Sequence, residues 1–126
     1  MRRKLFLIIA AILAGFFGAH MLLMPAKMLG NMATSNTVEM QYVLQWGGTM
    51  LLSIALINFL SRNDPGSQAL RAVMIGNIFM HVIALVVDVY DYNIHFIQPV
   101  GLISGAVVHG LLIAGFTYYT IRMKIA

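Results

Sequence analysis

The sequence predicts an all-α integral membrane protein whose four transmembrane helices pack as an up-down-up-down bundle. Its 126 residues are 60% hydrophobic and only 10% charged, whereas soluble domains carry about 25% charged residues. Four apolar segments fill nearly the whole chain, and each has the roughly 20 residues that a helix needs to span a bilayer. Seven of the eight basic residues fall at one end of these segments, as expected for the cytoplasmic side of a membrane protein.

The first apolar segment, 5–24, follows three basic residues at positions 2–4. A basic start before an apolar run is also typical of a signal peptide. This run is long for that role, however, and no small-residue cleavage site follows it, so we predict a retained spanning helix. The connector 25–41 is polar and loop-like, and its first part, 25–32, suits a short helix at the membrane interface.

The second spanning segment is predicted over 42–60, with Tyr42 and Trp46 near its start, where aromatic residues favour the membrane interface. The stretch 61–68 contains Asn-Asp-Pro-Gly, a strong turn signal. Two further spanning segments follow, over 69–90 and 98–121. A short connector between them contains the polar residues Asp91, Tyr92, Asn93 and His95. The four segments form one domain, 1–126.

The charges predict the orientation of this bundle. The basic residues at one end are Arg2, Arg3, Lys4, Arg62, Arg71, Arg122 and Lys124. The opposite end carries only Lys27, together with three of the four acids. Both termini are therefore expected in the cytoplasm, as in a multi-pass protein of a bacterial inner membrane. The net charge of +4 follows from this clustering, so we do not expect nucleic-acid binding.

Polar residues inside the spanning segments indicate where a site would lie, because such groups are costly in hydrocarbon. Asn77, His81 and Asp88 share one face of the third segment, within about 40° of one another at 3.6 residues per turn. Gln98 and His109 share a face of the fourth. Both histidines lie roughly 14–16 Å from the outer ends of their helices, near the midplane of a hydrocarbon core about 30 Å thick.

These observations predict a polar cavity in the outer half of the bundle, with the two midplane histidines as its anchors. Taken singly, each polar residue is better explained by interhelical hydrogen bonding, whereas the matched histidines together favour a site. The candidate ligand-binding residues are His81, His109, Asn77, Asp88, Gln98, His20, Gln45 and Thr49.

The two midplane histidines are compatible with three kinds of chemistry. They are candidates for the axial ligands of a haem b, for hydrogen-bond partners of a quinone carbonyl, and for a proton relay with Asp88. Gly101 and Gly105 form a GxxxG pattern, which lets helices approach closely. That pattern disfavours haem, which needs a wide gap, and it suits packing within the chain or against a second copy.

A methionine-rich stretch offers a separate candidate metal site. His20, Met24, Met28 and Met32 lie close together in the sequence, and thioether and imidazole ligands select copper. Methionine is also a flexible apolar filler, which explains the stretch without a metal.

Several function classes have no support in the sequence. The chain has no cysteine, which excludes disulfides and thiolate chemistry. It contains no Gly-rich phosphate loop, nucleophile elbow or HExxH zinc motif. We therefore expect a protein that is not an enzyme.

Short motifs along the chain resemble those of a known group of proteins. They are Gly18 and Pro25 at the end of the first segment, Trp46-Gly47-Gly48 in the second, and the stretch from Arg71 to His81 in the third. In this layout the chain resembles the small bacterial four-helix membrane proteins grouped with the DoxX-like families. The resemblance implies a four-helix bundle and a role beside a membrane redox or lipid system, and it carries over no catalytic residue.

Three functional hypotheses result. The first is a membrane protein that binds a lipophilic ligand or serves as an accessory subunit of a membrane complex. The second is a redox module in which the midplane histidines hold haem b or contact a quinone. The third is a small transporter or copper-handling protein that works as a homo-oligomer.

Overall fold

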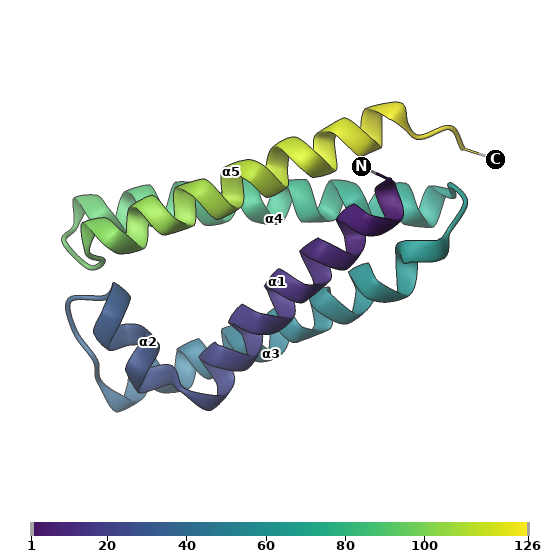
Figure 1. The fold of residues 1–126 in the computed structure, drawn as a ribbon. Coiled ribbons are helices and arrows are strands. Elements are labelled where there is room, and N and C mark those ends of the chain that lie inside the picture. Colours follow the sequence, from purple (N-terminus) through teal and green to yellow (C-terminus); the bar gives the residue numbers. More distant parts are fainter. Residues whose placement is uncertain (1, 126) are drawn as a thin grey trace.

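A computed structural model of the protein describes residues 2–125, and over that range it contains five α-helices and one short 3₁₀ helix (Figure 1). The elements are α1 (Arg3–Leu23), α2 (Pro25–Met32), α3 (Val38–Leu60), η1 (Ser61–Asn63), α4 (Gln68–Asn93) and α5 (Pro99–Arg122). The long helices α1, α3, α4 and α5 are each long and apolar enough to cross a membrane. The predicted all-α multi-pass architecture is therefore confirmed.

The helix ends differ from the predicted segments where local capping decides them. α3 begins at Val38 instead of residue 42, because the Thr37 side chain accepts a hydrogen bond from the Met40 N–H and caps the helix there. α4 continues to Asn93, so Asp91 and Tyr92 belong to the helix, not to the predicted connector. The predicted helix 25–32 forms as α2, with Pro25 in its first turn.

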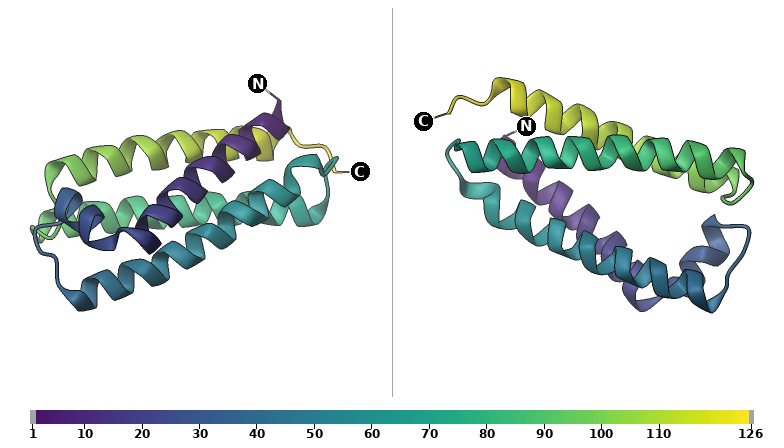
Figure 2. Two further views of the ribbon diagram at one scale, coloured as in Figure 1. Left: turned by 60° about the horizontal axis from the view of Figure 1, so that its bottom comes forward. Right: turned by 180° about the vertical axis from the view of Figure 1, so that it is seen from behind.

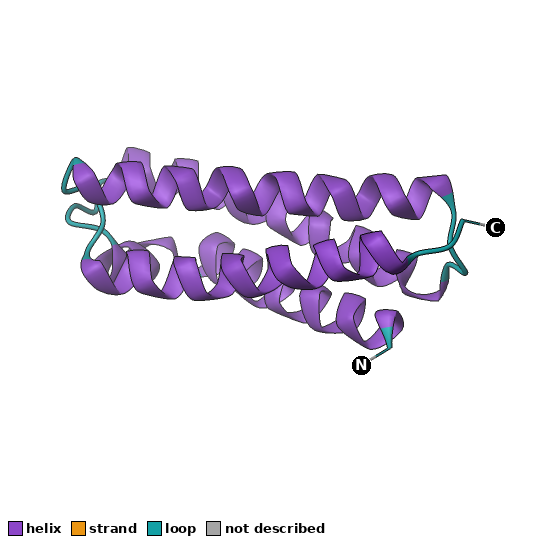
Figure 3. Ribbon diagram, turned by 90° about the horizontal axis from the view of Figure 1, so that it is seen from above, coloured by secondary structure: helices purple, strands orange, loops and turns teal. Residues whose placement is uncertain are grey.

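The four long helices form two hairpins, α1 with α3 and α4 with α5, which diverge from one another along the bundle (Figures 1 and 2). Seen from above, the long helices run in roughly the same direction, and both termini lie at one end (Figure 3). The seven basic residues predicted for one side belong to segments at this end, which we call the basic end. In each long helix, only 17% to 28% of the 18-residue apolar stretch is buried within the protein. Most of the apolar surface is therefore left for lipid.

A compact apolar core joins the two hairpins at the basic end. Phe6 of α1 packs against Phe116 of α5 with ring centroids 4.8 Å apart in an edge-to-face arrangement, and against Tyr119 at 5.1 Å. Leu7 and Met74 are fully buried in the same cluster. Because these residues come from the first, third and fourth long helices, the cluster holds the chain's two ends together.

The turn before α4 is built around Asp64 at the basic end. Its carboxylate accepts hydrogen bonds from the Ser67 hydroxyl at 2.7 Å and from the Gly66 N–H at 2.8 Å. The hydrogen bond from Ser67, followed by that from Gly66, holds the pKa of Asp64 below its ordinary value. The Asp64 carbonyl also accepts a hydrogen bond from Arg3. Gly66 has φ +136°, a conformation that favours glycine, so the predicted turn forms with its own polar groups satisfied.

At the end opposite the basic end, backbone hydrogen bonds tie the hairpins together. The Thr34 N–H donates to the Phe96 carbonyl at 2.8 Å, and the Gln98 N–H donates to the Met32 carbonyl at 2.9 Å. The Thr34 hydroxyl adds a hydrogen bond to the His95 carbonyl at 2.8 Å. α2 and the connector before α5 are therefore fastened to each other, and we call this contact the clasp.

Candidate functional site

The two midplane histidines face each other across the α4–α5 hairpin. His81 Nδ1 lies 2.9 Å from His109 Nδ1, and the ring centroids are 5.1 Å apart. His81 is 6% exposed and stacks on Phe116, with centroids 6.1 Å apart. The two histidines belong to consecutive antiparallel helices, and this geometry brings them into direct contact.

Asp88 extends the pair toward the clasp end of the hairpin. Its Oδ2 lies 3.7 Å from His109 Nε2 and is buried without a hydrogen-bond partner of its own. A Cβ at position 105 would collide with the carboxylate in this arrangement, so Gly105 makes room for it. Asp88, His109 and His81 thus form one polar chain between α4 and α5.

This chain has a preferred arrangement of protons when both histidines are neutral. A neutral imidazole has one N–H and one acceptor nitrogen. With its proton on Nε2, His109 turns an N–H toward the Asp88 carboxylate and leaves Nδ1 to accept from the His81 Nδ1–H. If the proton of His109 were on Nδ1 instead, the lone pair of Nε2 would face the Asp88 carboxylate oxygen, 3.7 Å away. Asp88 therefore orients His109, and His109 orients His81.

Nitrogen NMR of the two rings tests this arrangement. We expect His81 to carry its proton on Nδ1 and His109 on Nε2 in the wild-type protein at neutral pH. In Asp88→Asn the preference at His109 should weaken, because the carboxylate that selects it is gone. A His109 ring protonated on Nδ1 in the wild-type protein would contradict the assignment.

The two glycines of the GxxxG pattern make room for groups of the same chain. A Cβ on Gly101 would lie 3.0 Å from the Met32 carbonyl oxygen of the clasp, and the space beside Gly105 holds the Asp88 carboxylate. Each glycine thus has an intramolecular partner, which favours packing within the chain over packing against a second copy.

Asn77 makes its principal contact with α3, away from the histidines. Its side-chain amide and that of Asn58 exchange two hydrogen bonds of 3.0 Å each. Asn58 is 1% exposed. Sequence reasoning missed Asn58, because it stands alone in an apolar run; its only signal was an amide within a spanning segment.

The remaining candidates lie elsewhere in the fold. The Gln45 amide donates to the Leu22 carbonyl at 3.1 Å, linking α3 to α1, and the Gln98 amide donates to the Ala33 carbonyl at the clasp, also at 3.1 Å. Thr49 is exposed, and its hydroxyl donates to a carbonyl of its own helix.

His20 of α1 is half-buried and lies near Phe16, with ring centroids 6.1 Å apart. The structure thus gathers His81, His109 and Asp88, while the other five candidates have separate partners or surroundings. Ligand binding by these residues remains a prediction.

The histidine geometry does not fit haem as it stands. The axial nitrogens of a haem lie on opposite sides of the iron, roughly 4 Å apart if each metal–nitrogen bond is about 2 Å. The two Nδ1 atoms are instead at the 2.9 Å of a direct hydrogen bond. Within residues 2–125, no three His, Cys, Asp or Glu side chains lie together as a metal site.

The copper candidates occupy the junction of α1 and α2. Met24 immediately precedes α2 and is 53% exposed, whereas Met28 and Met32 are half-buried within α2. The Met32 backbone is part of the clasp, which gives this position a structural use independent of metal.

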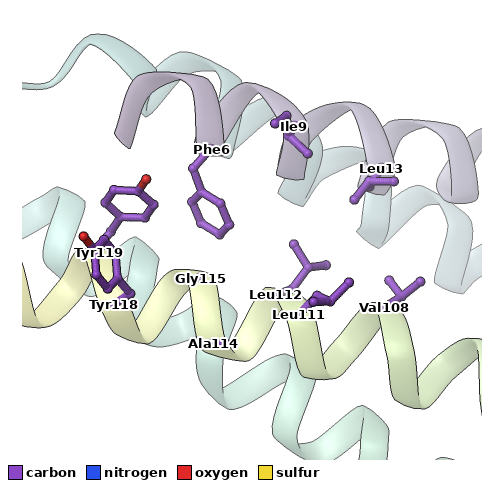
Figure 4. Close-up of a pocket in the computed structure, with 10 residues that line it drawn as sticks. All are labelled: Phe6, Ile9, Leu13, Val108, Leu111, Leu112, Ala114, Gly115, Tyr118 and Tyr119. Atoms are coloured by element: carbon purple, nitrogen blue, oxygen red, sulfur yellow. The ribbon is translucent and has the colours of Figure 1, made fainter. Parts of the chain in front are cut away.

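An open cavity lies between α1 and α5, toward the basic end, where sequence reasoning placed no site. It has a volume of about 660 Å³ and an apolar lining (Figure 4). Its walls include Phe6, Ile9 and Leu13 of α1 and Leu112, Tyr118 and Tyr119 of α5. A smaller cavity of about 190 Å³ lies between α3 and α4 and includes Asn77. Neither cavity is lined by any other candidate residue.

The chain significantly matches no protein-family model, no curated protein and no solved structure.

Proposed function

We propose that this protein binds a lipophilic molecule inside the bilayer, in the cavity between α1 and α5. The observation that carries the proposal is the size and lining of that cavity. Its volume of about 660 Å³ falls in the range of small-molecule sites, about 300–1,000 Å³, which are mostly apolar with a few polar groups. Two of the lining residues, Tyr118 and Tyr119, carry a hydroxyl (Figure 4).

The cavity opens where a molecule dissolved in the membrane would reach it. Ile9, Leu111 and Tyr118 line it and are 39%, 70% and 47% exposed, on helices whose apolar surfaces face lipid. A ligand would therefore enter sideways from the bilayer, without passing through water. We propose a cell-membrane location with both termini in the cytoplasm, in line with the basic end and with the DoxX-like resemblance.

The histidine chain has a supporting role in this proposal. Phe116, on which His81 stacks, belongs to the apolar core that also contains Phe6 of the cavity wall. The Asp88–His109–His81 chain fixes α5 against α4, and so fixes the wall that α5 supplies. An accessory role in a membrane complex is compatible with the same cavity.

Filling the cavity tests the proposal. Ala114 lines the cavity and is exposed, so Ala114→Trp should occupy the apolar volume while leaving the helix intact. Retention of co-purified lipid-soluble molecules, measured by native mass spectrometry, is expected to fall about tenfold, the effect of roughly 1.4 kcal/mol. The matched control is Ala72→Trp, an exposed alanine of α4 outside both cavities, which should retain the wild-type level. Equal retention in both variants would exclude the cavity as the binding site.

A further inference from the structure

Both walls of the α1–α5 cavity lead to an arginine at the basic end. On α5 the lining residues Leu111, Gly115 and Tyr118 follow helical spacing, and the next position on that face is Arg122. On α1 the lining residues Ile9 and Phe6 lead back by the same spacing to Arg2, the residue that immediately precedes the helix. Each lining face therefore leads toward a cationic position at the basic end.

The contacts at this mouth hold one of these cations in place. The Arg122 guanidinium carbon lies 4.6 Å above the centre of the Tyr118 ring, a cation–π arrangement, and Tyr118 is itself a wall of the cavity. Arg2 precedes Phe6 by one helical turn, since the Phe6 N–H donates to the Arg2 carbonyl at 3.2 Å. The acid of the basic-end segments, Asp64, already accepts two hydrogen bonds within its own turn.

The length of the cavity matches one leaflet of a bilayer. Its lining on α5 runs from Tyr119 back to Val108, which is roughly 17 Å along a helix at 1.5 Å per residue. Half of a hydrocarbon core about 30 Å thick is roughly 15 Å. A chain that starts at the arginines and lies along the cavity thus ends near the midplane.

From this arrangement we infer that the cavity takes one acyl chain of an anionic phospholipid, with the lipid phosphate between Arg2 and Arg122. The inference rests on the proposed function and names its ligand class. Guanidinium groups are well suited to phosphate, and basic sites beside transmembrane helices on the cytoplasmic side bind anionic head groups. The Tyr118 and Tyr119 side chains lie at the level where the head group meets the acyl chain.

Other occupants would use only part of this site. A quinone or a neutral lipid would fill the apolar cavity without needing either arginine. Inorganic phosphate would contact the arginines without needing the cavity. The experiment therefore changes the two parts of the site separately.

The test is native mass spectrometry of the purified full-length protein with phosphatidylglycerol and phosphatidylcholine of identical acyl chains. The wild-type protein is expected to prefer phosphatidylglycerol. Arg2→Gln and Arg122→Gln should each reduce that preference about five-fold, the usual effect of one basic residue at an anionic membrane surface. The matched control is Arg62→Gln: Arg62 also stacks on an aromatic ring at the basic end, 3.7 Å from the Phe59 centroid, but it lies in η1, outside the cavity.

The outcomes separate this inference from the proposed function. A reduced preference in the two cavity variants, with Arg62→Gln unchanged, supports the inference. An unchanged preference in all three overturns it, and the proposed function then still stands if Ala114→Trp empties the cavity. If Ala114→Trp retains both lipids at the wild-type level, both the inference and the proposed function are overturned. Displacement of phosphatidylglycerol by inorganic phosphate, equally in wild type and Ala114→Trp, would show a phosphate site without an acyl-chain site and would also overturn the inference.

Discussion

Gly48→Leu is expected to lower the free energy of unfolding by about 3 kcal/mol, at the upper end of the usual cost of overpacking. Gly48 lies where α3 crosses α1. A Cβ at this position would lie 2.8 Å from the Gly18 carbonyl oxygen and 2.9 Å from the Leu22 nitrogen. Both are backbone atoms of α1, so no side-chain rotation can relieve the collision, and the two helices must separate.

Unfolding by titration with a denaturing detergent measures this loss. Gly110→Leu is the control, because, apart from its chain neighbours and the adjacent backbone of α5, no atom lies within 4 Å of a Cβ placed at Gly110. It should change stability by no more than about 0.5 kcal/mol, as surface substitutions usually do. Similar losses in the two variants would mean that any leucine in a spanning helix is costly, and that the α1–α3 crossing has no special tightness.

Asn77→Leu is expected to have the second-largest effect, about 1–3 kcal/mol, because it leaves the Asn58 amide buried without its partner. Asn58 is 1% exposed, so neither water nor a lipid head group replaces the lost hydrogen bonds. The Asn58→Leu/Asn77→Leu double variant should recover part of this loss, since it removes both polar groups and no buried amide remains unpaired.

The double-mutant cycle on these two asparagines measures their coupling directly. Hydrogen bonds between transmembrane helices are worth about 0.6 kcal/mol on average and up to about 2 kcal/mol, so a coupling energy near the upper value is expected for two reciprocal bonds. Asn93→Leu is the control on the same helix: its amide donates to the Val89 carbonyl of α4, and it is exposed. Strict additivity of the two single variants would contradict the pairing.

The sequence predicted the features that depend on helical periodicity. Residues spaced by whole helical turns share one face, and consecutive antiparallel helices usually pack together, so His81 and Asp88 were expected to meet His109. Asn77 shares that spacing but pairs with Asn58 of α3 instead. The four spans followed from length and hydropathy alone. The helix ends were less accurate where a single cap, such as Thr37, extends a helix beyond its apolar run.

The features that depend on the angle between helices were not predictable in the same way. The α1–α5 cavity exists because the first and last helices meet at Phe6 and Phe116 and then diverge. The sequence of α1 or of α5 does not indicate which helix packs against it, or at what angle the two helices cross. Asn58 was missed for a related reason, because its partner Asn77 lies on another helix, and no local pattern connects them.

The division of the bundle into two hairpins has a consequence for folding. Most helix–helix contacts join helices that are neighbours in the chain, which corresponds to a low contact order and to rapid folding. The contacts that join more distant segments include the aromatic cluster of Phe6 and Phe116 and the clasp of Thr34 and Phe96. The Arg3–Asp64 hydrogen bond and the Asn58–Asn77 pair add to them. We therefore expect each hairpin to form once its own two helices are in the bilayer, and the two halves to dock afterwards.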